Sequence, residues 1–313
     1  MTDIMDIVNK YRNIKIKGLK EIAKNVQIRR IDLREKRKQE EGEKKNKTGT
    51  ILDEMIGGGL GEGESMLLYG EFGAGKTQTC FTMSVMSPEK VVYIDTEGSF
   101  RVQRIIEICE ARGMDTERVL DKIILFQPTN WVEILELLVN FPKYVKETDI
   151  GLIIMDSLTK RIRGIEFAGR ESLTVKQPIV REILLRLEEI ARAYKASVVI
   201  TTQIYESPTA NPFLPDWTSQ RPVGGASLEH QPDYVIFLRK AEGNIRIARA
   251  MDSSYKPLCE RPFIITKAGI EDLPQEEKIT EKIMKKAEQY EKKHSIGQDI
   301  KVEKVDVNDQ EAS

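Results

Sequence analysis

Short apolar runs recur along the chain between residues 48 and 272, and each is bounded by turn residues. Runs of this length are typical of buried strands. The predicted strands are Met66–Tyr69, Val91–Asp95, Ile123–Phe126, Gly151–Asp156, Ser197–Thr202, Tyr234–Leu238 and Phe263–Thr266. The intervening segments have apolar positions at helical spacing. The predicted helices are Lys76–Met86, Phe100–Arg112, Trp131–Val139 and Gln177–Tyr194. This alternation predicts an α/β fold with a mostly parallel twisted sheet and helices on both faces.

The two ends of the chain differ from this core. Residues 1–47 have apolar positions at helical spacing but become almost continuously charged after Arg29. This pattern predicts a short helical N-terminal segment and a polar linker. Residues 273–313 predict a charged helix to about Lys293, followed by a disordered tail. We therefore expect three regions, 1–47, 48–272 and 273–313, with the ordered core in the middle one.

Charge distinguishes the N-terminal segment from the rest of the chain. The whole chain has a formal net charge of −1 and is not a polycation. Residues 1–47 alone contain 15 Lys and Arg against 8 Asp and Glu. A basic arm of this kind binds nucleic acid, binds an acidic partner, or only aids solubility. Because the chain has no apolar run of about 18 residues and no signal-peptide stretch, we expect a cytoplasmic protein.

A glycine-rich segment directly follows the first predicted strand. Gly70–Thr77 reads GEFGAGKT and fits G-x-x-x-x-G-K-[ST] at every required position. Its glycines let backbone N–H groups point into an anion-binding concavity, and the helix that begins there adds its positive dipole end. Lys76 supplies charge to the β- and γ-phosphates, and Thr77 offers a hydroxyl to Mg²⁺. The strand-loop-helix context disfavours a chance match and predicts that ATP or GTP is bound here.

Polar residues at the ends of other predicted strands complete a candidate nucleotide site. Asp156 ends an apolar strand, where an acid can hold Mg²⁺ through water, although such an acid can also serve an ordinary turn. Glu97 lies two residues beyond the strand Val91–Asp95 and is a candidate to orient or deprotonate the attacking water. Gln203 ends the strand Ser197–Thr202, and its amide can report whether a γ-phosphate is present. From chemistry alone, Glu97 and Gln203 are equally compatible with structural roles.

Together these segments resemble the RecA/RadA family of strand-exchange recombinases, and the archaeal RadA branch in particular, over residues 48–272. GEFGAGKTQ at Gly70–Gln78 is similar to the family's GEFGSGKTQ. YIDTEGSFRVQRI at Tyr93–Ile105 is similar to YIDTEGTFRxERI, and MDSLTKRIR at Met155–Arg163 to VDSxTSHFR. The resemblance implies a RecA-like P-loop NTPase core that uses ATP and Mg²⁺. The residues implied to cradle ATP are Gly70, Glu71, Phe72, Gly73, Ala74, Gly75, Lys76, Thr77 and Gln78.

The same resemblance implies a role for individual residues. Glu97 corresponds to the family's water-activating glutamate, which gives it a catalytic role together with Lys76. Arg104 corresponds to an arginine that packs on adenine, and Asp156 to the acid linked to Mg²⁺. Gln203 corresponds to the switch glutamine of the family's TNQV segment, in which this chain has Thr202 in place of Asn.

Two loops are similar to the family's DNA-binding loops and span residues 161–177 and 205–225. The second is long for a compact domain, which is typical of a functional or disordered loop. Arginines that contact phosphates and aromatic side chains that stack on bases suit single-stranded DNA. The candidate DNA-binding residues are Arg161, Arg163, Arg170, Lys176, Phe213, Trp217, Arg221, Gly224 and Gly225. The alternative for each arginine is a solvated surface charge.

Several departures from the family pattern concern assembly rather than ATP binding. Residues 1–47 are shorter than the family's N-terminal domain, and the subunit-linking F-x-x-A motif is not legible. Ala226 replaces the His that follows the double glycine. The cap over a neighbouring subunit's ATP reads DSSYKP at Asp252–Pro257 instead of DAPHLP, so that Asp252 and Pro257 remain. These losses indicate a RadA paralogue rather than the principal recombinase.

We therefore expect a DNA-dependent ATPase that acts in homologous recombination and DNA repair. Its expected partners are single-stranded or double-stranded DNA, a main RadA recombinase or other paralogues, and further subunits in a homo- or hetero-oligomer. One alternative is a non-catalytic mediator that uses ATP only to stabilise an assembly with DNA or recombinase. Another is a DnaB-like helicase or a KaiC-like ATPase, which the two DNA loops and the YIDTEGSFR stretch disfavour.

Overall fold

The computed structural model describes residues 42, 45–163, 171–206, 220–253 and 259–273. The chain forms two compact units, the first comprising residues 1–205 and 221–274. Of the second unit, residues 206–220 and 275–313, only Glu206 and Gln220 are described. The expected N-terminal helical segment and C-terminal tail lie almost entirely outside the described residues. Within the described residues, no helix has the length and apolarity needed to cross a membrane.

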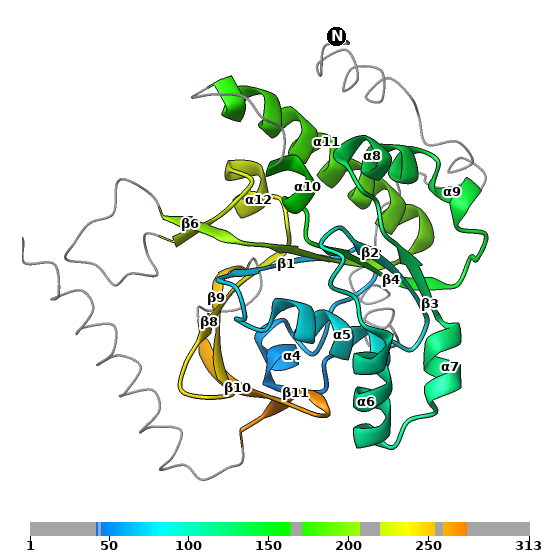
Figure 1. Cartoon of the computed structure of the whole chain (residues 1–313), viewed down its shortest axis with the longest axis vertical. Helices are drawn as coiled ribbons and strands as arrows, with labels where there is room; N and C mark the ends of the chain where they lie inside the picture. The colour runs from blue at the N-terminus through cyan, green and yellow to red at the C-terminus, as the bar shows by residue number, and fades with distance from the viewer. Residues whose placement is uncertain (1–41, 43–44, 164–170, 207–219, 254–258, 274–313) are drawn as a thin grey trace, which may run out of the picture. The chain divides into compact units, whose positions relative to one another are not determined.

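A nine-stranded sheet forms the centre of the first unit (Figure 1). The strand order is β11-β10-β9-β8-β1-β5-β4-β2-β3. The strands are β1 (Ser65–Gly70), β2 (Lys90–Asp95), β3 (Ile123–Phe126), β4 (Ile150–Asp156), β5 (Ser197–Thr202), β8 (Tyr234–Lys240), β9 (Ile245–Ser253), β10 (Glu260–Thr266) and β11 (Gly269–Asp272). Pairings from β8 through β3 are all parallel, whereas β8, β9, β10 and β11 are joined antiparallel. The predicted mostly parallel sheet is therefore confirmed.

Helices cover both faces of this sheet, as the sequence predicts. Figure 1 shows α8, α10 and α11 on one face and α4, α5 and α6 on the other. The helices are α4 (Ile51–Met55), α5 (Lys76–Met86), α6 (Val102–Arg112), α7 (Thr116–Asp121), α8 (Trp131–Val139), α9 (Phe141–Tyr144), α10 (Lys160–Arg163), α11 (Glu171–Tyr194) and α12 (Ala226–His230). Strands β1, β4 and β5 are buried along their whole length because they are covered on both faces, which explains their continuous apolar sequences.

Two strands of the antiparallel part were not predicted. Arg246 and Arg249 interrupt the apolar residues of β9, of which Ile247, Ala248 and Ala250 are buried. Arg249 pairs with Glu260 at 2.6 Å. A strand interrupted in this way gives no continuous apolar run. The short β11 is two residues away from β10 in the sequence and forms a hairpin with it.

Two helix starts differ from the prediction. Phe100 precedes α6 rather than beginning it, because its backbone N–H donates to Asp95 and its ring packs against Tyr93 with centroids 4.9 Å apart. Helix α11 is already formed at Glu171, although we predicted a start at Gln177. Pro178 favours the first turn of a helix, but here it lies inside one. The expected loop 161–177 is correspondingly shorter.

Candidate functional site

The glycine-rich segment forms the connection between β1 and α5. Gly75 is the N-cap residue of α5 and has a φ of 104°, a left-handed conformation that favours glycine. No side chain caps α5, and uncapped N–H groups in the first turn of a helix can bind an anion. Phe72, at the other side of the loop, is 84% exposed. The geometry is that of a phosphate-binding loop.

Lys76 extends back across this loop. Its ammonium group donates to the carbonyl oxygens of Gly70 and Glu71, each at 2.8 Å. Burial lowers the pKa of Lys76 from its ordinary value, and the negative charges of Asp156 and Glu97 oppose that shift. All three groups lie at the carboxyl edge of the parallel strands, because Lys76 begins the helix after β1, Glu97 follows β2 and Asp156 ends β4.

Asp156 is held by hydroxyl groups from three elements. Tyr93 of β2 donates to its Oδ2 at 2.9 Å, Thr201 of β5 donates to its Oδ1 at 2.6 Å, and Thr77 of α5 also forms a hydrogen bond with it. Burial raises the pKa of Asp156 above its ordinary value, and these three hydrogen bonds oppose that shift. A carboxylate and a hydroxyl side by side are hard oxygen donors of the kind that Mg²⁺ takes, so the predicted metal pair Thr77 and Asp156 fits this ion.

Glu97 is presented by a turn that Asp95 organises. The carboxylate of Asp95, which is 1% exposed, accepts hydrogen bonds from the backbone N–H groups of Glu97, Ser99 and Phe100. Such a side-chain-to-backbone turn is a common use of aspartate after a strand. That signal could have identified Asp95, which our sequence analysis did not single out as a functional residue.

The carboxylate of Glu97 is fixed from the adjacent strand end. The Ser157 hydroxyl donates to Glu97 Oε1 at 2.7 Å, and the Lys160 ammonium nitrogen lies 4.0 Å from Oε2. The register of β2 and β4 places Asp95 opposite Asp156, which brings Glu97 alongside Ser157. Neither Ser157 nor Lys160 carried a role in the sequence analysis, because their contact with Glu97 arises only from strand pairing.

Arg104 links α6 to the start of α5 and to the β10–β11 turn. Its guanidinium donates to Gln78 Oε1 at 2.8 Å and to the carbonyl oxygens of Thr266 and Lys267. It also forms an ion pair with Glu107 at 3.0 Å. Because the edge of the group is used in these hydrogen bonds, contact with a nucleotide base would have to use its planar face, as the expected role on adenine requires.

The antiparallel part of the sheet also contacts the phosphate-binding loop. Arg246 Nε donates to the Gly73 carbonyl oxygen at 2.8 Å, and the ammonium nitrogen of Lys240 lies 3.9 Å from a carboxylate oxygen of Glu71. A Cβ on Gly75 would lie 3.3 Å from the Phe263 ring. Sequence analysis missed Arg246 because it did not predict β9.

The predicted DNA-binding residues are only partly described. Arg161 lies in α10, and its charge lowers the pKa of Glu133 on α8 in addition to the larger effect of hydrogen bonds from Thr129. Lys176 lies in α11 rather than in a loop. Arg221 lies in β7 (Gln220–Pro222), which pairs with β6 (Ile204–Glu206). It forms an ion pair with Glu229 at 3.5 Å.

Other predicted residues lie outside the described part of the chain. These are Arg170, Phe213, Trp217 and Pro257. For Arg163 and Asp252, the structure describes the backbone, in α10 and β9, but not the side chain. The nucleotide cap and the DNA contacts therefore stay predictions. Gln203 follows β5, and its carbonyl oxygen accepts a hydrogen bond from the Val223 N–H at 2.8 Å.

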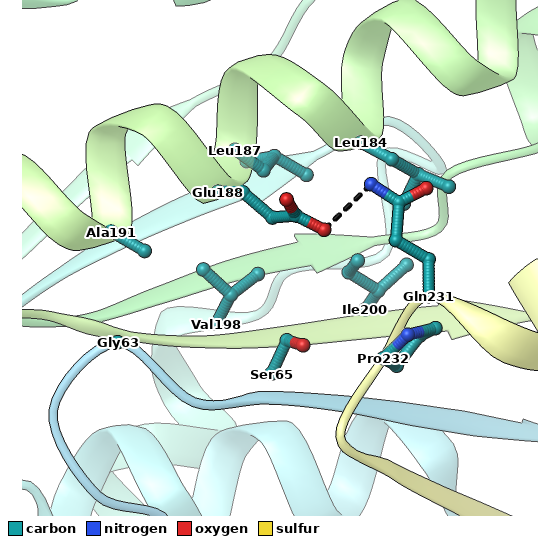
Figure 2. A pocket seen from close by; sticks show the side chains of 10 residues that line it. All are labelled: Gly63, Ser65, Leu184, Leu187, Glu188, Ala191, Val198, Ile200, Gln231 and Pro232. Carbon is teal, nitrogen blue, oxygen red and sulfur yellow. Dashed lines mark hydrogen bonds between the residues drawn. The ribbon is translucent and has the colours of Figure 1, made fainter.

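A separate pocket lies at the opposite end of β1, between α11 and the sheet (Figure 2). Leu184, Leu187 and Val198 contribute apolar side chains to it, and Gln231 donates to Glu188 at 2.6 Å across its rim. It contains none of the predicted site residues. The candidate chemistry is thus confined to the carboxyl edge of the parallel strands.

Known proteins are similar to this chain in sequence and in fold. A family model described as Rad51 matches residues 45–273. The DNA repair and recombination protein RadA of Aeropyrum pernix is 38% identical over 239 residues, which covers 73% of this chain and 73% of the relative. RadA of Cenarchaeum symbiosum is 37% identical over 249 residues, covering 76% of this chain and 61% of the relative. The crystal structure of the RadB recombinase superposes with a TM-score of 0.63 at 29% identity, covering 73% of this chain and 100% of that chain.

Proposed function

This chain belongs to the Rad51 family, and we propose that it is a DNA-dependent ATPase that acts in homologous recombination and DNA repair. One observation carries the proposal. The described structure brings Lys76, Thr77 and Asp156 together with Glu97 at one edge of the sheet, where each has a defined partner. A phosphate-binding loop alone would support nucleotide binding, whereas a fixed carboxylate beside it supports hydrolysis.

Each side chain has a distinct task in the proposed reaction. The N–H groups of the first turn of α5 and the Lys76 ammonium bind the phosphates of ATP. Thr77 and Asp156 hold Mg²⁺, which when bound neutralises developing charge on the phosphate oxygens. Glu97 accepts a proton from the attacking water, and Ser157 fixes the orientation of that carboxylate. Gln203 relays the phosphate state to the loop that follows it.

The proposed partners follow from the family and from the loops. We place single-stranded or double-stranded DNA at the two loops, and a main RadA recombinase or other paralogues as protein partners. The likeness to RadA and RadB proteins and the altered cap at Asp252–Pro257 support a RadA paralogue. The same altered cap favours the second candidate function, a mediator that binds ATP for assembly and does not hydrolyse it.

Turnover of ATP by a Glu97→Gln variant tests this proposal. The glutamine keeps the shape of the side chain but cannot take the proton, so we expect turnover with and without single-stranded DNA to fall about 10²- to 10⁴-fold. Binding of a fluorescent ATP analogue should remain close to that of the wild type. Glu110→Gln on the exposed side of α6 is the matched control and should leave turnover unchanged.

Three outcomes separate the candidate functions. Loss of turnover in Glu97→Gln but not in Glu110→Gln supports the ATPase function, with Glu97 as the base. Wild-type turnover in that variant contradicts the catalytic assignment. A wild-type protein that binds ATP and DNA but has no turnover, with or without DNA, contradicts the ATPase and leaves the mediator.

A further inference from the structure

The bases of the two predicted DNA loops are joined by a chain of hydrogen bonds through Thr202. The Thr202 hydroxyl donates to the carbonyl oxygen of Val223 at 2.8 Å, near the end of the second loop. It also lies 2.9 Å from the hydroxyl of Thr159, which precedes the first loop. A hydroxyl has one hydrogen, and Thr202 uses it on Val223, so Thr159 must be the donor to Thr202. The relay therefore has a direction, from Thr159 through Thr202 to Val223.

Both hydroxyls of this relay are buried. Thr202 is 0% exposed and Thr159 is 3% exposed. Water cannot easily replace a hydroxyl in such a place, so removing one leaves a buried polar group without its partner. The relay is thus a specific link between two backbone segments that are distant in the sequence.

The end of the second loop is also held at two other points. The Val223 N–H donates to the Gln203 carbonyl oxygen at 2.8 Å, which ties it to the residue directly after β5. Gly225 packs so closely against Gln177 that a Cβ would overlap the side-chain amide. Gln177 is the last residue of the predicted first loop and lies in α11. The end of the second loop therefore contacts both the end of β5 and the end of the predicted first loop.

The end of β5 and the segment that follows β4 both reach the nucleotide site. Thr201 donates to Asp156, whereas its neighbour Thr202 belongs to the relay, because successive side chains of a strand point to opposite sides. Likewise, Ser157 donates to Glu97 only two residues before Thr159. Either acid is thus connected to the relay through at most two residues of backbone.

We propose that Thr202 is a positioning residue that couples both loops to each other and to the nucleotide site. Through its two hydrogen bonds the bases of the two loops, at Thr159 and Val223, respond to bound nucleotide as one unit. This inference deepens the proposed function and rests on it for the identity of the nucleotide and of the loops. Thr202 thus acts beside Gln203, which the proposed function already assigns to relaying the phosphate state.

Hydrogen–deuterium exchange of the full-length chain tests the relay without requiring turnover or DNA. The measured segments are 157–163, at the first loop, and 220–230, at the end of the second, each with and without a slowly hydrolysed ATP analogue. In Thr202→Val, which keeps the shape but loses the hydroxyl, we expect exchange in both segments to rise about fivefold, as for loss of one buried hydrogen bond. The analogue should slow exchange in both segments of the wild type but not in segment 220–230 of the variant.

Two controls distinguish coupling from a general loss of stability. Thr202→Ser restores the hydroxyl and should restore the response of segment 220–230 to the analogue. Ser197→Ala removes a buried hydroxyl that donates to Leu60 and Gly61 at the other end of β5 and should leave that response intact. An unchanged response of both segments in Thr202→Val would overturn the proposal, and so would a failure of Thr202→Ser to restore it.

Binding of a fluorescent single-stranded oligonucleotide provides the functional readout. The wild type should bind more tightly with the ATP analogue than without it, and Thr202→Val should reduce that difference about fivefold. A wild type that neither hydrolyses ATP nor binds the oligonucleotide contradicts the proposed function, and the exchange data then decide the relay by themselves.

Discussion

The parallel and antiparallel parts of the sheet contribute differently to the candidate site. The residues proposed for chemistry lie at or just beyond the ends of parallel strands: Lys76 follows β1 at the start of α5, Glu97 follows β2, and Asp156 ends β4. The antiparallel strands β9 and β10 carry no such residue within the described chain, but contact the phosphate-binding loop through Arg246 and Phe263. In parallel sheets the carboxyl ends of strands gather at one edge and form a natural site. The residues proposed for chemistry and those that support the phosphate-binding loop therefore come from separate halves of one sheet.

Replacement of Lys76 should have the largest effect, because it removes the cation of the parallel half. In Lys76→Ala we expect ATP turnover to fall about 10²- to 10³-fold, with a large loss of ATP affinity, because the variant loses the ammonium group that two carbonyl oxygens hold at the loop. Steady-state turnover and titration of a fluorescent ATP analogue measure this. Lys143→Ala, on α9, is the control. Unchanged affinity would show that the phosphates are held elsewhere.

Replacement of Arg246 tests whether the antiparallel half only supports the loop. Arg246→Ala removes the charge-assisted hydrogen bond to the Gly73 carbonyl oxygen, so we expect KM for ATP to rise about tenfold while kcat changes less than about twofold. Arg261→Ala, an exposed residue of β10, should leave both constants unchanged. A fall in kcat with unaltered KM would show that the antiparallel half contributes to the chemical step, and would contradict a purely supporting role.

Replacement of Asp156 should have a smaller effect than the two changes above, and this effect is on the pH dependence of the free energy of unfolding. Burial raises the pKa of this carboxyl in the folded chain above its ordinary value. Because the folded state binds this proton more tightly than the unfolded state, the protonated carboxyl favours folding at low pH. The free energy of unfolding falls as the pH rises from the unfolded pKa to the folded pKa of Asp156. With a chelator present, Asp156→Asn should therefore gain stability relative to the wild type as the pH rises above the ordinary aspartate pKa of about 4.

Urea unfolding at several pH values measures this difference. Asp149→Asn is the control, because Asp149 is largely exposed and pairs with Lys90 at the other end of the sheet. An equal pH dependence of the wild type and Asp156→Asn would show that hydrogen bonds from Tyr93 and Thr201 fully compensate the burial of the charge.

Local patterns in the sequence determined the parallel half. Apolar runs identified β3 and β5 with their observed bounds. Strand β5 is buried throughout because it is covered on both faces, which requires apolar side chains on both. The spacing of glycines, Lys76 and Thr77 identified the loop, because its anion site is made of neighbouring backbone N–H groups. These features depend on residues close together in the chain.

Only the tertiary structure decided the contacts between distant segments. Ser157 meets Glu97 because β2 and β4 pair with Asp95 opposite Asp156, and a different register would separate them. Strand β9 was not predicted because Arg246 and Arg249 interrupt its apolar residues, so the contact of Arg246 with the phosphate-binding loop was not predicted either. The Thr202 relay likewise joins residues that strand order brings together. A sequence pattern specifies local backbone and burial, whereas hydrogen bonds across the fold depend on how the strands align.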